Sequence, residues 1–205
     1  MYSRQRGLIL GFHGCDLEVR DLIISNTQEI KASQNDYDWL GHGVYFWENS
    51  ISRAEEYATY LKDNPGRSKN PIKNPSVVGS VLDLGFCLDL TDFKNLSLLK
   101  IAFNILVETY KKSGFVIPNN SKGGSKTDLL KRDLDCAVIE TLHLTREENK
   151  LDPFDSLKGV FWEGDDLYPN AGFKEKNHIQ LCIRNRNCIK GLFIPQKEDS
   201  SFRKV

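Results

Sequence analysis

Long hydrophobic runs are missing from this chain of 205 residues. The apolar stretch at residues 8–12 is too short for the core of a signal peptide or for a membrane span, and residues 1–7 before it are polar and basic. We therefore expect a cytoplasmic protein without a membrane partner.

An excess of charge of one sign is also missing, because 28 lysine and arginine residues balance 28 aspartate and glutamate residues. No field of the whole molecule would then attract nucleic acid or an anionic membrane. A local cluster of basic residues still leaves a nucleic-acid partner open, since a patch is sufficient for such binding. This cluster comprises Lys122, Lys126, Lys131 and Arg132.

Cysteine is scarce and scattered, with five residues and neither a CxxC pair nor a His/Cys cluster at zinc spacing. We expect buried free thiols, and no bound metal. The cysteines are Cys15, Cys87, Cys136, Cys182 and Cys188.

The length of the chain favours one domain over residues 1–205, and hydrophobic periodicity indicates the α+β class. Short β-rich segments lie at both ends of the chain, helical spacing dominates a mainly helical insert at about residues 90–145, and no βαβ alternation is present. Strands are predicted at residues 7–13, 44–47, 77–84, 159–162, 179–183 and 188–194. Helices are predicted after Asp16, from a capping box at residues 52–55, and at residues 96–111 and 135–144.

Two glycine motifs carry the chemistry. His13-Gly14 ends the first strand, and Gly41-His42-Gly43 leads into the aromatic strand Val44-Tyr45-Phe46. Glycine lets a flat ligand approach the backbone, and an aromatic ring that follows it can stack on that ligand. The capped helix after this strand carries Ala54 and Tyr57.

This ordered combination resembles the catalytic core of ADP-ribosyltransferases of the poly-ADP-ribose polymerase and diphtheria-toxin branch. Their first motif is His-Gly, and their second is a Gly-x-Gly-Ile-Tyr-Phe strand followed by a Ser-x-x-Ala-x-x-Tyr-like helix start. Their third is a glutamate on a late strand. The resemblance covers about residues 8–60 and implies a split antiparallel β-sheet flanked by helices, with NAD as substrate and no metal.

Carried over to this chain, the resemblance implies that the Gly14 backbone holds the nicotinamide carboxamide and that His13 hydrogen-bonds a ribose hydroxyl. Tyr45 would stack on the nicotinamide ring, and Tyr57 would close its other side. The remaining residues expected to bind NAD are Gly43, Phe46 and Ala54.

The third motif departs from the family. In the late strand, alternation places His178, Gln180 and Cys182 on one face and the isoleucines and leucine on the other, so we expect the polar face to look at the cleft. Gln180 is the first candidate for the glutamate position, Glu175 is its rival, and His178 is third. A glutamine can orient a ribose hydroxyl but cannot offset positive charge as a carboxylate does, which favours single ADP-ribose transfer over chain elongation.

The sequence thus predicts an NAD-dependent mono-ADP-ribosyltransferase, by resemblance a bacterial toxin or phage-defence effector with a neutralising partner protein. The acceptor, protein or nucleic acid, stays open. The resemblance also suggests that Trp39 belongs to a lid over NAD. It further suggests that residues 161–169 form a loop that recognises the acceptor. The alternatives are an NAD glycohydrolase and an inactive module that binds NAD or ADP-ribose.

Overall fold

The structure is a computed structural model that describes residues 7–68, 70–123, 125, 128–197 and 199–203, so residues 1–6 and Lys126 of the basic cluster lie outside it. Within the described residues a seven-stranded sheet is flanked by four α-helices, which confirms the α+β class. The elements in chain order are β1 (Ile9–Asp16), α1 (Leu17–Ile24), β2 (Val44–Glu48), α2 (Ile51–Asp63), η1 (Pro65–Arg67), β3 (Pro75–Leu82), β4 (Cys87–Asp89), α3 (Phe93–Ser113), α4 (Asp133–Glu148), β5 (Ser156–Phe161), β6 (His178–Ile183), η2 (Arg186–Cys188) and β7 (Ile189–Phe193).

The strands follow the order β4-β5-β6-β2-β1-β3-β7. Neighbours are antiparallel except β4 and β5, which are parallel. The sheet is therefore mixed, where a purely antiparallel sheet was expected. The parallel pair arises because the chain crosses over through α3 and α4 between these strands, and a parallel connection requires such a long crossover. The three-residue β4 is too short for alternation to reveal, and the sequence did not predict it.

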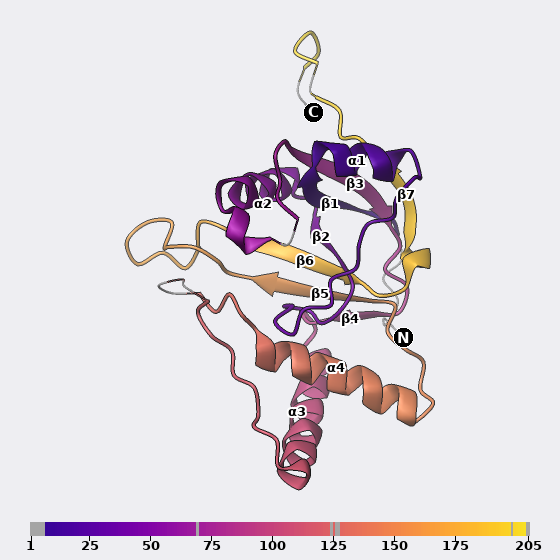
Figure 1. Cartoon of the computed structure of the whole chain (residues 1–205), viewed down its shortest axis with the longest axis vertical. Helices are drawn as coiled ribbons and strands as arrows, with labels where there is room; N and C mark the ends of the chain where they lie inside the picture. The colour runs from indigo at the N-terminus through magenta and orange to yellow at the C-terminus, as the bar shows by residue number, and fades with distance from the viewer. Residues whose placement is uncertain (1–6, 69, 124, 126–127, 198, 204–205) are drawn as a thin grey trace.

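The sheet is weakly joined at its middle. β1 pairs with β3 over eight residues and β2 pairs with β6 over four, but β1 and β2 share only the pairs Gly11↔Glu48 and Phe12↔Trp47. Beyond these pairs the two strands separate. Figure 1 shows β1, β3 and β7 with α1 and α2 in one half, β4, β5 and β6 with α3 and α4 in the other, and β2 running between them.

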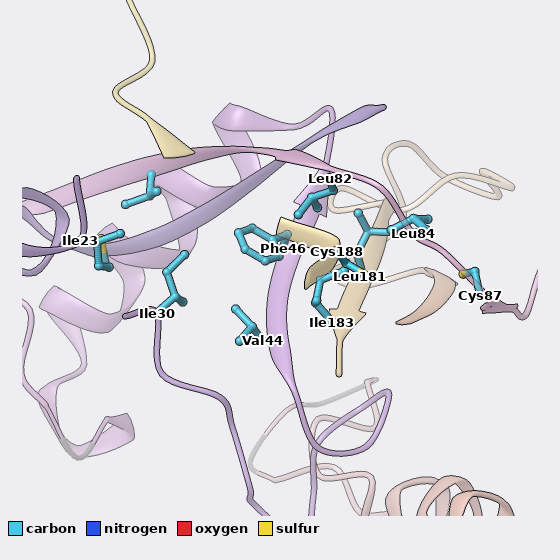
Figure 2. Packing of buried hydrophobic residues seen from close by; sticks show 12 residues of the cluster. Ile23, Ile30, Val44, Phe46, Leu82, Leu84, Cys87, Leu181, Ile183 and Cys188 are labelled. Carbon is cyan, nitrogen blue, oxygen red and sulfur yellow. The ribbon is translucent and has the colours of Figure 1, made fainter. Parts of the chain in front are cut away.

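Both faces of the sheet carry core. On one face, alternate residues of β2 and β6 meet side chains of β3, and Figure 2 shows part of this first cluster around Phe46. On the other face, β5 and β6 pack against α3 and α4 in a second cluster that contains Leu157, Cys182 and Ile139. Each fully buried aliphatic or aromatic side chain contributes roughly 1.5–3 kcal/mol to stability. The two clusters therefore fix which side chains of each strand point to which face of the sheet.

The helix starts were predicted with mixed success. Asp16 caps α1 as expected, since its side chain accepts a hydrogen bond of 3.0 Å from the Glu18 amide. The capping box predicted at residues 52–55 is wrong by two residues, because α2 begins at Ile51 after an N-cap at Ser50 that makes no side-chain cap bond. Asn49, at φ 51°, turns the chain sharply from β2 into the helix and fixes this earlier start.

All five cysteines are free thiols and buried, as predicted. None of the helices in the described parts of the chain combines the length and the apolar character that crossing a membrane requires.

Candidate functional site

The first motif lies where β1 and β2 separate. His13 Nδ1 is 2.9 Å from the Tyr45 carbonyl oxygen, in hydrogen-bond contact across the opening. Next to it, α2 lies so close to Gly14 that a β-carbon there would overlap the carbonyl oxygen of Ala54. Gly14 thus allows the helix and the strand to touch, and its backbone stands at the start of the opening.

His13 and Tyr45 point to opposite faces of the sheet. The His13 ring packs edge-on against Phe46 at a centroid distance of 6.0 Å, and Phe46 belongs to the first cluster. Tyr45 precedes Phe46 in the strand, so its side chain leaves by the other face, where it packs against the second cluster. Burial lowers the pKa of His13, so the imidazole is neutral at pH 7.

The Tyr45 hydroxyl is bonded within the protein. It donates to the Gly41 carbonyl oxygen at 2.6 Å and accepts from the Leu40 amide at 2.8 Å. Burial raises its pKa, so the phenol stays protonated. Tyr45 therefore holds the turn before its own strand, and only its ring is available for the stacking that the resemblance implies.

Close packing against α4 and β6 requires glycine at both positions of the second motif. Gly41 has φ +71°, and a β-carbon there would meet Glu140 and Ile139 of α4. At Gly43 it would meet the Cys182 sulfur and the Ile183 backbone of β6. Glu140 also accepts a bond of 2.8 Å from the His42 amide and pairs with Arg184 at 2.6 Å. This turn is thus clamped between β6 and α4.

The late strand alternates as predicted, and two of the three side chains on its polar face are buried. Gln180 pairs with Trp47 and Cys182 with Tyr45 in the register of β2 and β6. Cys182 is 0% exposed and His178 is 7% exposed. The turn at residues 39–41 and the ring of Phe161 pack over this face at His178 and Cys182, whereas Gln180 is half-buried.

Glu175 does not join these residues. It is exposed and lies in the loop at residues 162–177, before β6 begins. Its Oε2 accepts a bond of 3.4 Å from the Asp165 amide, and its own amide donates to the Asp165 carbonyl oxygen at 3.1 Å. Its contacts therefore serve to close the loop.

Aromatic side chains gather on the face that Tyr45 and Gln180 share. We call Trp39, Trp47, Tyr57, Phe161 and His178 the aromatic cluster. The centroid of the His178 ring is 6.2 Å from that of Trp39, 5.8 Å from that of Phe161 and 6.5 Å from that of Trp47. Tyr57 approaches Trp47 at 5.1 Å from α2. The cluster thus brings together two predicted residues, Tyr57 and the third candidate His178.

Four polar atoms in and beside the aromatic cluster are buried and have no hydrogen-bond partner among the described residues. They are Trp47 Nε1, Arg53 Nε, His178 Nε2 and Gln180 Oε1. An unsatisfied buried polar group costs about 1–3 kcal/mol, so such atoms mark a place for a polar ligand or ordered water. Sequence reasoning missed Trp47 and Arg53, which looked like part of a strand and of a helix start.

Ion pairs fasten the loop at residues 162–177 beside this cluster. The guanidinium carbon of Arg53 is 5.4 Å from the centroid of the Trp47 ring. The same guanidinium forms ion pairs with Glu163, where Nη2 is 2.5 Å from Oε2, and with Glu56. Lys176 pairs with Glu56 at 2.7 Å. The segment predicted to recognise an acceptor therefore lies against α2, with Trp162 59% exposed.

Trp39, predicted as part of a lid, is anchored by its indole nitrogen, which donates to the Leu130 carbonyl oxygen at 2.9 Å. The guanidinium carbon of Arg132, a residue of the basic cluster, is 4.3 Å from the centroid of the Trp39 ring and 4.8 Å from that of Phe161. Lys131 lies over the Tyr37 ring at 5.7 Å. These two cations thus brace the aromatic cluster and its surrounding loop, which the sequence did not indicate.

A hollow of about 210 Å³ lies elsewhere, and it is lined by Ala32, Ser33, Gln34, His42, Gly43, Val44, Ile183, Arg184 and Arg186. It shares Gly43 with the predicted site, but His13 and Gly14 do not line it. Across the described parts of the chain, no three His, Cys, Asp or Glu side chains group as metal ligands.

The chain is distantly similar to a protein of Methanocaldococcus jannaschii that is described as uncharacterized. The two sequences are 26% identical over 200 residues, which cover 88% of this chain and 84% of the relative. No family model matches the chain. No solved structure matches it either.

Proposed function

We propose that the protein is an NAD-dependent mono-ADP-ribosyltransferase whose site lies where β1 and β2 separate and extends over the aromatic cluster. The observation that carries the proposal is the opening itself. The strands stop pairing after Phe12 and Trp47, and the two glycine motifs then lie on its two sides. A split sheet of the ADP-ribosyltransferase type would have its cleft at such a place.

The side chains around the opening suit the reaction. Cleavage of NAD between nicotinamide and ribose passes through a cationic, oxocarbenium-like sugar, and neutral nicotinamide leaves. Tyr57 and Tyr45 offer ring faces for nicotinamide, and Gly14 lies on the strand next to the helix that carries Tyr57. Holding ring and ribose in one geometry supplies orientation, which can lower the barrier by several kcal/mol.

The late strand supplies no carboxylate to the aromatic cluster. Gln180 and His178 lie there, whereas Glu175 is exposed in the loop. Amide and imidazole groups can accept a hydrogen bond from a ribose hydroxyl, but they do not offset the positive charge that develops on the sugar. This supports transfer of single ADP-ribose units, by the resemblance in a toxin or phage-defence effector that acts on a protein or nucleic-acid acceptor.

Nicotinamide release from NAD tests the proposal. The purified protein is assayed with and without cell lysate, next to Tyr57→Ala and His13→Ala. Tyr60→Ala is the matched control, because Tyr60 lies on the same helix but packs against Leu61 and Ile72. We expect lysate to stimulate release, and Tyr57→Ala and His13→Ala to abolish it while the control stays active.

The same assay separates the alternatives. Release in buffer without an acceptor would identify an NAD glycohydrolase. Binding of NAD with no release under any condition would identify an inactive module that binds NAD or ADP-ribose. The absence of carboxylates among the late-strand residues of the cluster is the observation that favours this module.

A further inference from the structure

The hydrogen bonding of His178 fixes which of its nitrogens carries the proton. Nδ1 is 2.8 Å from the carbonyl oxygen of Lys176, and a carbonyl oxygen only accepts. Nδ1 must therefore donate, so in the neutral ring Nε2 has a free lone pair. This Nε2 is buried and has no partner in the described structure.

The surroundings of Nε2 match a particular kind of ligand group. Trp47 Nε1 and Arg53 Nε are unpartnered donors, whereas His178 Nε2 and Gln180 Oε1 are unpartnered acceptors. Two neighbouring hydroxyls, each of which donates one bond and accepts others, satisfy such a set. Because the charge of Arg53 is already paired with Glu163 and Glu56, the set suits an uncharged diol better than a phosphate.

We propose that His178, as a neutral imidazole, accepts a hydrogen bond from a ribose hydroxyl of the ligand, and that Trp47 Nε1 and Arg53 Nε donate hydrogen bonds to the ribose hydroxyls. This inference rests on the proposed function and assigns the third position of the site to His178, in place of Gln180 alone or Glu175. His178 then selects for a ribose that carries both hydroxyls.

Burial, assisted by two nearby cations, keeps His178 neutral. Burial lowers its pKa, and the cations Arg53 of α2 and Arg132 before α4 act in the same direction. The bond to the Lys176 carbonyl oxygen and the carboxylate of Glu163 oppose them. The acceptor lone pair is therefore present at pH 7 and is lost only in solution more acidic than the usual histidine pKa of 6.5.

The test is a titration with ADP-ribose, which carries the ribose hydroxyls and cannot release nicotinamide. The ¹⁵N signals of the four histidines are followed in labelled protein and assigned with His178→Phe. We expect the His178 Nε2 signal to move on binding while Nδ1 stays protonated. This readout uses the wild-type chain and does not depend on how a variant folds.

Affinity supplies the second readout. His178→Phe keeps a ring against Trp39 and Phe161 but removes the acceptor, so we expect the dissociation constant for ADP-ribose to rise about tenfold. His178→Gln restores an acceptor and should recover most of the affinity. The matched control is His143→Phe, because the His143 Nε2 is also buried and unpartnered but packs against Phe154.

The outcomes separate this inference from the proposed function. If ADP-ribose moves the Nε2 signal but NAD is never cleaved, the ribose site stands and the transferase fails. If NAD is cleaved while Nε2 does not move and His178→Phe binds as the wild type, the inference is overturned and the transferase stands. Failure of ADP-ribose to bind overturns the inference as well.

Discussion

His13 and Tyr45 are joined by a contact of 2.9 Å between His13 Nδ1 and the Tyr45 carbonyl oxygen, yet their side chains lie on opposite faces of the sheet. The contact bridges the two strands at the point where regular pairing ends. The two side chains therefore cannot meet one ligand from the same face of the sheet. Of the two, only Tyr45 shares its face with Gln180 and the aromatic cluster.

Gly14→Ala should destabilise the fold by roughly 1–3 kcal/mol, because the new β-carbon overlaps the Ala54 carbonyl oxygen and α2 must shift. Denaturant unfolding measures the change. Gly191→Ala is the control, since a β-carbon on Gly191 has no neighbour within 4 Å and should change stability by less than about 0.5 kcal/mol. Equal stability of the two variants would mean that α2 does not lie against Gly14.

Lys158→Met should destabilise the protein by about 3–5 kcal/mol, because it leaves the Glu48 carboxylate buried without its partner. Lys158 Nζ is 2.7 Å from Glu48 Oε2, and both side chains are almost fully enclosed. The double variant Lys158→Met with Glu48→Leu should recover most of the loss in denaturant unfolding. Lys174→Met, which breaks an exposed pair with Asp166, should cost no more than about 1 kcal/mol. A similar loss in both single variants would contradict the burial of the first pair.

Tyr45→Phe should speed hydrogen exchange at the Leu40 amide and cost about 1–3 kcal/mol of stability, because the buried amide loses its acceptor. Exchange at single amides can be followed by NMR. Tyr168→Phe, on an exposed ring, is the control. Unchanged exchange at Leu40 would show that the turn at residues 39–41 does not depend on the Tyr45 hydroxyl.

His143 should make the fold lose stability in mild acid. Burial, assisted by the Arg184 cation, lowers its pKa from 6.5 to about 4. Between these values the unfolded chain binds more protons than the folded one, so stability falls as pH falls from 6.5 to about 4. Comparison of unfolding free energies at several pH values should show a shallower decline for His143→Phe. Parallel curves for the two proteins would mean that His143 titrates normally.

Most of the helices and strands could be predicted from the spacing of hydrophobic residues along the chain. The strand at residues 179–183 and the helices at 96–111 and 135–144 were confirmed with bounds one to four residues short, since alternation and helical spacing weaken where the ends meet turns. The missed β4 owes its existence to pairing with β5, from Cys87↔Ser156 to Asp89↔Lys158. A three-residue strand has too few positions for alternation to mark it.

The candidate site was anticipated only in part. The sequence singled out Tyr57 and, as a third choice, His178, and the structure brings both into the aromatic cluster. Glu175 belongs to a loop, and on the polar face of β6 His178 and Cys182 are buried while Gln180 is half-buried. Arg53 and Trp47 gave no local signal, because an arginine in the first turn of a helix and a tryptophan in a strand are ordinary at those places.

The sequence by itself determined the class of the fold, the alternation within each strand and the position of both glycine motifs, because these depend on residues close together in the chain. Only the tertiary structure decided that His13 and Tyr45 face opposite ways and that Trp47, Arg53, His178 and Gln180 meet. Their meeting depends on the register of β2 with β6, strands separated by more than a hundred residues, where a shift of one residue would turn every side chain to the other face.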